Sequence, residues 1–509
     1  MKVHALAPSP TAGPDAEDLR RIGYPQQLHR RLGWFSSFAA GFSFVSILTT
    51  VFQLFALGYS FGGPAFFWTW PLVFAGQLCV ALVFAELAAS WPLAGCIYQW
   101  SRRLSGEALG WFAGWAMMVG YIVSVAAIGI ALQAVLPAVW SGFQVVGTDP
   151  SITSASGAAN GILLGSLLIA VATVISAVGV RFMALINGIG VTCEIIGVVL
   201  LLALLFGHVQ RGPGVVTETL HVPGHSPYLY AFLASTLMAA YVMYGFDSAA
   251  ELSEETTRPR RVVPAAILRA LLVSFVGGGF MIVAALMAAP SLIDGQLATN
   301  GIAYVITSQL DPSLSRALLA VVAIAIVSAC LAIQNSASRV MFSMARDGRL
   351  PGARWLAGVH RSTGTPLVTG IAVGVLAIAV LLINLGNPAA FAAVTSTSVV
   401  IVYLAYLLVT GPALVVRWRG RLPAAPPGAF TLGRFGLPVN LIAVGYGAAM
   451  MVNIAWPRRE VYDPAGTSWV LQYLALLFVA GLVTAGALVH RRLRGKIPVP
   501  AVAAATGKA

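Results

Sequence analysis

Charged residues are scarce in this sequence. Of its 509 residues only 9% are Asp, Glu, Lys or Arg, whereas 58% are hydrophobic. A soluble domain carries about 25% charged residues, and a soluble chain of this length would divide into several domains that each need a polar surface. The scarcity of charge therefore excludes a soluble protein and predicts that lipid is the solvent around much of the chain.

Lysine, cysteine and histidine are also rare. The three lysines lie close to the two ends of the chain, at Lys2, Lys496 and Lys508. The four cysteines and seven histidines show no metal-ligand spacing and no pairing of nucleophile and base, and no phosphate-binding glycine loop with its lysine occurs. These absences argue against an enzyme, against a resident metal or cofactor, and against an ATP-driven pump.

Long apolar runs dominate what is present. A helix crosses the hydrocarbon core of a bilayer with about 20 apolar residues. About twelve runs of suitable length lie near 33–58, 65–89, 108–137, 159–179, 183–207, 229–251, 264–289, 314–340, 366–384, 389–412, 436–456 and 468–489. The expected fold class is an all-α polytopic membrane protein with about 12 transmembrane helices.

Arginine supports this count of spans. The net charge of +13 comes from short basic clusters between apolar runs, which are typical of topology signals and not of nucleic-acid binding. With a cytoplasmic N-terminus, the external segments hold only Arg211, Arg316, Arg458 and Arg459. The sequence therefore predicts a cytoplasmic tail over 1–32, a transmembrane domain over 33–490 and a cytoplasmic tail over 491–509. Both tails are expected to be loosely attached, and the expected location is the cell (plasma) membrane.

Two spans contain small and polar residues inside an apolar run. The first includes Gly41-Phe42-Ser43-Phe44-Val45-Ser46, and the sixth includes Tyr244-Gly245-Phe246-Asp247-Ser248. Interrupted helices at corresponding positions of two repeated halves mark the substrate site in inverted-repeat transporters. Unwinding frees N–H groups that bind a carboxylate and carbonyls that hold an ammonium group, so a zwitterionic amino acid fits such a pair of breaks. Close helix packing is the alternative role of these glycines.

Four runs form a specific pattern: Gly62-Gly63-Pro64-Ala65, the run 86–100 with Trp91-Pro92, the run 245–261 with Glu254-Glu255, and the run 338–348 with Arg346-Asp347-Gly348. In their order and spacing they resemble the amino acid–polyamine–organocation superfamily, and the pattern is most similar to its amino acid/choline transporter branch. Together they extend the resemblance over roughly residues 33–490.

The resemblance implies a leucine-transporter-type fold, in which spans 1–5 and 6–10 form inverted repeats and two further helices are peripheral. It also implies secondary transport by alternating access. Residues that match the two unwound regions of the family inherit a substrate-contact role: Gly41, Phe42, Ser43, Ser46, Tyr244, Gly245, Phe246, Asp247 and Ser248.

Acids inside the spans are expected to have a structural or functional role, because insertion of an ionisable side chain at the bilayer centre costs about 2.5–3.5 kcal/mol. Asp247 is expected either to meet the amino group of the substrate or to cap the second half of the broken helix. Glu194, in the middle of the fifth span, is the proton-coupling candidate; a counter-charge for a cationic substrate and a structural acid are its alternatives. The spans contain no lysine, so the lysine-based coupling of some relatives does not transfer to this chain.

Charges near the inner ends of the spans are expected to be structural. Glu86 is expected to pair with an arginine of the loop that follows the second span. Glu251 and the acids 254–255 are expected to be solvated at the interface, with a gate through Arg258 or Arg261 as the alternative. The run 346–348 is expected to end a helix with a local ion pair.

The predicted function is a permease for an amino acid or a related amine. A choline-type or polyamine-type cation is the alternative substrate, and a nutrient sensor on a transporter scaffold is a further alternative. The expected partners are this small molecule and the lipid bilayer, with no nucleic acid. The coupling ion is left open between H+ and Na+, and a sodium site would combine first-span carbonyls with hydroxyls such as that of Ser328.

Overall fold

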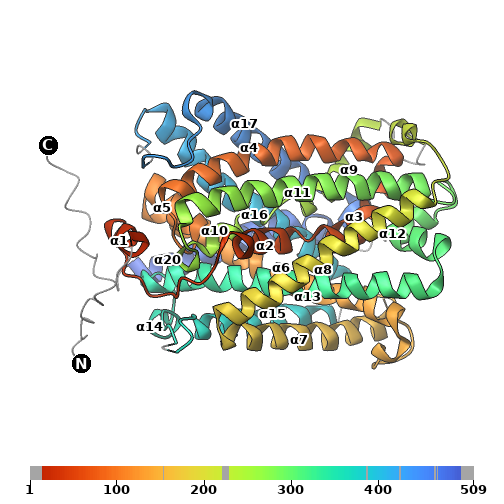
Figure 1. Cartoon of the computed structure of the whole chain (residues 1–509), viewed down its shortest axis with the longest axis horizontal. Coiled ribbons are helices and arrows are strands. Elements are labelled where there is room, and N and C mark those ends of the chain that lie inside the picture. The colour runs from red at the N-terminus through yellow and green to blue at the C-terminus, as the bar shows by residue number, and fades with distance from the viewer. Residues whose placement is uncertain are drawn as a thin grey trace.

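Long helices run side by side between the two ends of a bundle (Figure 1). The computed structural model describes residues 14–152, 154–220, 228–360, 362–385, 388–422, 426–462, 466 and 468–494, without the side chains of 388–397 and 494. The outer parts of both expected tails, 1–13 and 495–509, lie outside the described residues. In the part of the chain that is described, the β-structure consists of one isolated bridge between Leu32 and Thr256.

Eleven helices in the described chain are long and apolar enough to cross a membrane. The eleven lie in α2 (Trp34–Val45) with α3 (Ile47–Gly62), η1 (Pro64–Trp68) with α4 (Thr69–Ser90), α6 (Glu107–Val139), α7 (Ala155–Val178), α8 (Val180–Gly207), α11 (Pro259–Ala288), α13 (Pro312–Arg346), α15 (Leu367–Leu381) with η5 (Leu382–Leu385), α16 (Pro388–Trp418), α17 (Gly436–Ala455) and α20 (Leu474–Arg494). The shorter helices α9 (Tyr228–Val242) and α10 (Ser248–Glu251) lie between α8 and α11. The sixth predicted span is broken, and its first half, α9, has 15 residues. The prediction of an all-α polytopic membrane protein is confirmed.

The outside of the bundle is apolar. On α7, Leu167 and Val174 are 61% and 64% exposed, whereas Leu168 and Ile169 on the opposite side are 5% and 0% exposed. Large apolar side chains that are exposed in such numbers would be an aggregation hazard in water. Lipid is the solvent that accommodates this surface.

The connections differ between the two ends of the bundle. Figure 1 places α1 (Pro14–Arg21), α5 (Cys96–Ser105) and α14 (Ala353–Leu356) at one end, here called the α1 end, and α12 (Gln296–Gln309) at the other. The remaining short elements are η2 (Ser141–Phe143), η3 (Pro213–Thr217), η4 (Ser253–Glu255), η6 (Gly433–Phe435), α18 (Arg459–Tyr462) and α19 (Trp469–Gln472). The ordered helices α5 and α12 lie in connections where the sequence predicted no helix.

The N-terminal segment 14–32 is packed onto the α1 end. Its buried apolar side chains are Leu19, Leu28 and Leu32. The Leu32 amide donates to the carbonyl of Glu255 at 2.9 Å, and the Thr257 amide donates to the carbonyl of Leu32 at 2.9 Å. The expectation of a loosely attached tail is therefore wrong for these residues, because the segment supplies partners for backbone groups beyond the sixth span.

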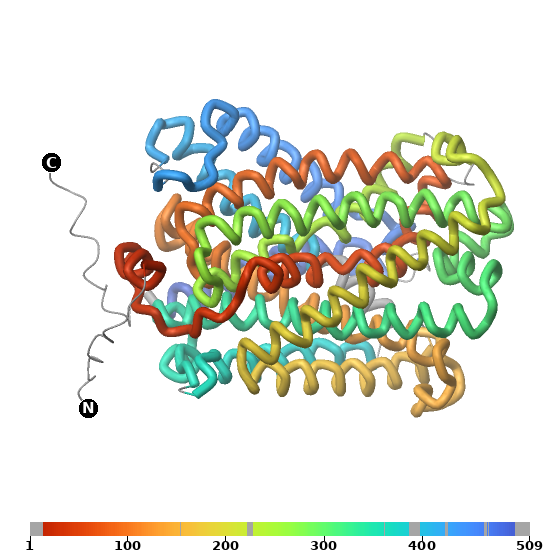
Figure 2. Tube along the Cα trace, viewed as in Figure 1, coloured from red at the N-terminus to blue at the C-terminus, as the bar shows by residue number. Residues whose placement is uncertain are grey.

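The first span runs through the middle of the bundle. In Figure 2 the red tube of α2 and α3 passes between α11 and α13, and the yellow tube of α8 crosses it obliquely. This crossing brings the fifth span against the middle of the first span, where the helix is interrupted.

Candidate functional site

The first span is interrupted at one residue. Ser46 lies between α2 and α3 with φ 40° and ψ 73°, a left-handed conformation that non-glycine residues adopt rarely. Its amide donates to the carbonyl of Phe42 at 2.7 Å, and the Thr50 hydroxyl donates to the Ser46 carbonyl at 2.9 Å. Strained backbone of this kind persists only where its surroundings fix it, and it clusters at functional sites.

Glu194 of α8 lies against this break. One carboxylate oxygen accepts hydrogen bonds from the Ser46 hydroxyl at 3.1 Å and from the Leu48 amide at 3.2 Å. The acid therefore holds the amino-terminal end of α3, where the helix dipole favours negative charge. The other carboxylate oxygen is buried without a hydrogen-bond partner among the described residues.

The eighth span also reaches this region. Gly190, one helical turn before Glu194, packs so tightly that an added Cβ would lie 1.6 Å from the hydroxyl of Ser328 on α13. The hydroxyl of Ser328, a predicted sodium ligand, is thus close to α8, the helix that carries the proton-coupling candidate Glu194.

The sixth span is unwound over a longer stretch. Residues 243–247 separate α9 from α10, and Gly245 has φ 88°. A Cβ at this position would lie 1.8 Å from the ring of Phe44. Glycine is therefore required at position 245 for two reasons: its backbone conformation is left-handed, and the Phe44 ring leaves no space for a side chain.

Asp247 is held by two tyrosines. The Tyr121 hydroxyl of α6 donates to one carboxylate oxygen at 2.7 Å, and the Tyr406 hydroxyl of α16 donates to the other. Tyr406 also accepts a hydrogen bond from the Gly245 amide at 3.0 Å. No side-chain bond caps α10, so the capping interpretation of Asp247 is wrong for this conformation; the acid instead ties the third and tenth spans to the break.

The two breaks lie side by side. The Ser248 hydroxyl donates to the carbonyl of Ala40 in the first span at 2.7 Å. The Phe44 ring lies 5.1 Å from that of Tyr121 and 5.7 Å from that of Tyr244. Tyr244 is the one partly exposed member of the predicted site residues, and its hydroxyl lies 3.3 Å from that of Ser124 on α6.

Other predicted site residues have packing roles here. A Cβ on Gly41 would lie 3.0 Å from that of Ala270, which is the close-packing role of a membrane glycine. The Phe42 ring stacks on Phe38 with centroids 5.5 Å apart. Phe246 is fully buried, whereas the Ser43 hydroxyl is buried without a hydrogen-bond partner among the described residues.

Two buried ion pairs lie toward the α1 end, in the segment that follows the sixth-span break. Arg346 of α13 donates two hydrogen bonds of 2.9 Å to the carboxylate of Glu254, and Arg339 donates one of 2.9 Å to Glu255. The side chains of both acids are 0% exposed. These two pairs are here called the ion-pair layer. The expectation that Glu251 and residues 254–255 are solvated is wrong, because all three acids are 0% exposed. The alternative gate through Arg258 or Arg261 is also wrong, because the arginines that pair with residues 254–255 are those of α13.

Asp347 has partners from other segments. It accepts hydrogen bonds from Arg102 at 2.6 Å, Tyr98 at 2.9 Å and Tyr24 at 3.0 Å. The predicted local pair with Arg346 is wrong, because Arg346 is taken by Glu254.

Glu86 also has a partner other than the predicted one. It pairs with Arg417 at the end of α16, and its second oxygen accepts a hydrogen bond from the Leu432 amide at 3.0 Å. The prediction that it pairs with the following loop is wrong.

The sequence is similar to known proteins over most of its length. A family model described as "Amino acid permease" matches residues 32–483. The chain is 27% identical to "Amino-acid permease BAT1" of Arabidopsis thaliana over 91% of this chain and 92% of that protein. It is 29% identical to "Amino-acid permease BAT1 homolog" of Oryza sativa subsp. japonica over 86% of this chain and 87% of that protein. It is 25% identical to "Amino-acid permease 2" of Neurospora crassa over 91% of this chain and 86% of that protein.

Proposed function

Because this chain belongs to the amino acid permease family, we propose that it is a secondary transporter that moves an amino acid or a related amine by alternating access. The observation that carries the proposal is the meeting of two interrupted helices, joined by the bond from Ser248 to the Ala40 carbonyl. Interrupted spans expose backbone amides and carbonyls at membrane depth, where a zwitterion needs both.

The substrate site comprises the two breaks and the groups between them. The partly exposed ring of Tyr244 packs against the substrate. The Ser43 hydroxyl, which has no partner among the described residues, forms a hydrogen bond with it. Backbone groups near Ser46 and Gly245 bind the ends of the zwitterion. Asp247 acts through Tyr121 and Tyr406, which hold its carboxylate, and so positions the unwound segment.

Glu194 couples a proton to this movement. A carboxylate binds amide donors more strongly than a neutral carboxylic acid does, because charge-assisted hydrogen bonds are the stronger ones. Protonation therefore weakens the hold of Glu194 on Ser46 and Leu48. The start of α3 is then free to move when the first span tilts.

The transport unit spans 33–490, and we assign the α1 end to the cytoplasm of a plasma-membrane protein. The arginine-rich segments lie at this end, in agreement with the positive-inside rule. The ion-pair layer then seals the cytoplasmic side in this conformation, and the cycle requires its opening.

A cationic amine remains the second candidate substrate. Asp247, Glu194 and Glu251 are buried, and none forms an ion pair with a described basic residue. Buried acids without counter-charges favour a ligand with a positive group. Asp247 is bonded to Tyr121, whose ring lies against that of Phe44, so aromatic faces are present beside this acid.

Uptake into proteoliposomes tests these proposals. The panel consists of neutral and basic amino acids, γ-aminobutyrate, choline and putrescine, each with a proton gradient, a sodium gradient or neither. Accumulation of an amino acid supports the main proposal, whereas exclusive uptake of choline or putrescine favours the cationic alternative. Binding without uptake or exchange of any compound contradicts transport.

Glu194→Gln tests the coupling. The variant is expected to retain exchange of substrate across the membrane but to lose accumulation driven by the proton gradient. The exposed Glu460→Gln is the control and keeps both activities. Normal proton-driven accumulation by Glu194→Gln would remove Glu194 from the mechanism.

A further inference from the structure

Four acids of the sixth-span segment are buried, namely Asp247, Glu251, Glu254 and Glu255, but only two of them form ion pairs with described arginines. Glu254 and Glu255 each pair with an arginine of α13. Asp247 receives two tyrosine hydroxyls. Glu251 is 0% exposed and forms no ion pair with a described Lys, Arg or His. An unpaired charge in such a place is strongly unfavourable, so Glu251 requires a proton or another cation.

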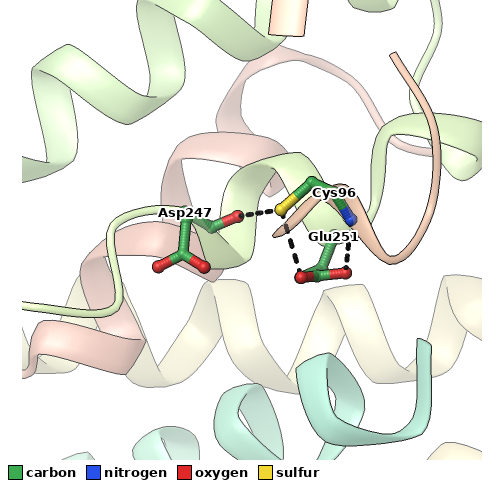
Figure 3. A group of neighbouring side chains, drawn as sticks. All are labelled: Cys96, Asp247 and Glu251. Atoms are coloured by element: carbon green, nitrogen blue, oxygen red, sulfur yellow. Dashed lines mark hydrogen bonds between the residues drawn. The ribbon is translucent and has the colours of Figure 1, made fainter. Parts of the chain in front are cut away.

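The only side chain that bonds to Glu251 in the described chain is that of Cys96, at the start of α5. The Cys96 amide donates to one carboxyl oxygen at 3.2 Å, and the Cys96 sulfur lies 3.1 Å from the other. The same sulfur lies 3.9 Å from the backbone carbonyl of Asp247, which points toward it while the Asp247 carboxylate points away (Figure 3).

The lack of a positive partner favours a proton on Glu251. The Cys96 thiol donates to one carboxyl oxygen and the Cys96 amide donates to the other, and neither donor carries a charge. A buried carboxylate without a counter-charge is strongly unfavourable, and a bound proton removes that charge. In the protonated state the carboxylic acid donates its O–H to the sulfur, and the single thiol proton is then free to face the Asp247 carbonyl.

Charged and titratable groups of the neighbouring elements make the surroundings acidic. Glu254 and Glu255 of η4 have partners of their own, Arg346 and Arg339 of α13. The groups nearest to Glu251 are Cys96 of α5, Asp247 of the unwound segment and Tyr121 of α6. Tyr406 of α16 lies on the far side of Asp247, to which it is bonded. None of these groups supplies a positive charge, and a proton is the smallest cation that would balance the carboxylate.

The position of Glu251 connects the substrate site to the cytoplasmic side. On one side, Cys96 links it to the backbone of Asp247. On the other, the Ala94 amide in the same connection donates to Glu254 of the ion-pair layer at 3.1 Å. Opening of this layer therefore exposes Glu251 before it exposes the substrate site.

We propose that Glu251, held by Cys96, is a second proton-binding site of the transport cycle that exchanges its proton with the cytoplasm when the ion-pair layer opens. In this step the Glu251 O–H bond breaks and the proton passes to water. The carboxylate that remains keeps the hydrogen bond from the Cys96 amide and accepts a hydrogen bond from the Cys96 thiol, which keeps its own proton. The inference rests on the proposed function as a transporter.

The test uses the full chain in proteoliposomes and measures two quantities for each variant. Counterflow exchange of a labelled amino acid without a gradient reports transport, and accumulation driven by a pH gradient reports coupling. Glu251→Gln keeps an acceptor for the Cys96 amide but cannot release a proton. It is expected to retain counterflow and to lose both accumulation and the dependence of counterflow on internal pH.

Two cysteine variants give an independent measurement. Cys96→Ser keeps a donor and acceptor beside Glu251 and is expected to shift the internal-pH dependence of counterflow. Cys330→Ser, at a buried cysteine of α13, is the matched control and leaves this dependence unchanged. The Cys96 comparison still decides the matter if Glu251→Gln fails to fold.

The outcomes separate this inference from the proposed function. Absence of counterflow in the wild type contradicts the transporter itself. Wild-type counterflow without any response to pH, or an unchanged pH response in both Glu251→Gln and Cys96→Ser, overturns the proton site alone. The site would be assigned to a metal cation if Cys96→Ser abolished inhibition by Cd2+ while both variants kept the wild-type pH response. That result would also overturn the proton site.

Discussion

The ion-pair layer is predicted to control access from the α1 end, and Arg346→Gln is the perturbation that tests it. In this conformation Arg346 binds Glu254 through two hydrogen bonds of 2.9 Å, and the side chains are 7% and 0% exposed. Removal of one partner from a buried ion pair costs about 3–5 kcal/mol. If the open state solvates Glu254, most of this cost falls on the closed state. A shift of about 3 kcal/mol changes the ratio of open to closed molecules by roughly a hundredfold.

Cys96 is a native reporter of that opening, because it is 0% exposed behind the layer. The assay measures the rate at which a water-soluble maleimide labels Cys96 in the full chain, with Cys79 and Cys193 replaced by serine. Arg346→Gln is expected to increase the labelling rate by roughly the hundredfold change in the open population. Labelling that persists after Cys96→Ser would show that another thiol is being measured.

Arg349→Gln is the matched control, three residues along the chain. Arg349 pairs with Glu107, which is 46% exposed, and such surface pairs contribute about 0–1 kcal/mol. The double variant Glu254→Gln with Arg346→Gln removes both charges of this pair, so no unpaired charge is left there, and it is expected to open less than Arg346→Gln alone. Equal labelling rates in Arg346→Gln and Arg349→Gln would refute the gating role.

Two further predictions concern the sixth-span break. Gly245→Ala is expected to abolish uptake and to lower the melting temperature, because the left-handed backbone costs about 1–2 kcal/mol with a side chain and the added Cβ overlaps Phe44; Gly445→Ala, which points into open space, is the control, and equal uptake by the two would contradict the requirement for glycine. Tyr121→Phe removes one hydrogen bond to Asp247 and is expected to destabilise the protein by about 1.5–3 kcal/mol, measured by thermal unfolding in detergent; an unchanged melting temperature would count against the anchoring of Asp247.

Much of the fold follows from local sequence. Each span was predictable because about 20 consecutive apolar residues satisfy one physical requirement, the thickness of the hydrocarbon. The sixth-span break was predictable for the same kind of reason, since Gly245 beside Asp247 is a poor continuation of an apolar helix. The first break was placed less well: Gly41 lies inside α2, and the chain unwinds at Ser46. That position depends on Glu194, which is 148 residues away in the sequence.

The sequence does not identify the residues with which the buried acids pair. An acid within a span indicates that a partner is needed, but Glu86 pairs with Arg417, which is 331 residues away, and not with a neighbouring loop. Likewise, nothing local identifies Tyr121 and Tyr406 as the groups that hold Asp247. Apolar helices in lipid have few sequence features that report their rotation or their neighbours.

The sequence by itself therefore determined the lipid environment, the all-α fold class, the sixth-span break and the presence of acids within the spans. These are properties of single segments, and they depend on apolar length and on residues that tolerate an unwound backbone. Only the tertiary structure decided which acids receive arginines and which remain without a basic partner. That division depends on which helix faces are brought together, and it separates the ion pairs of the α1 end from Glu194, Asp247 and Glu251.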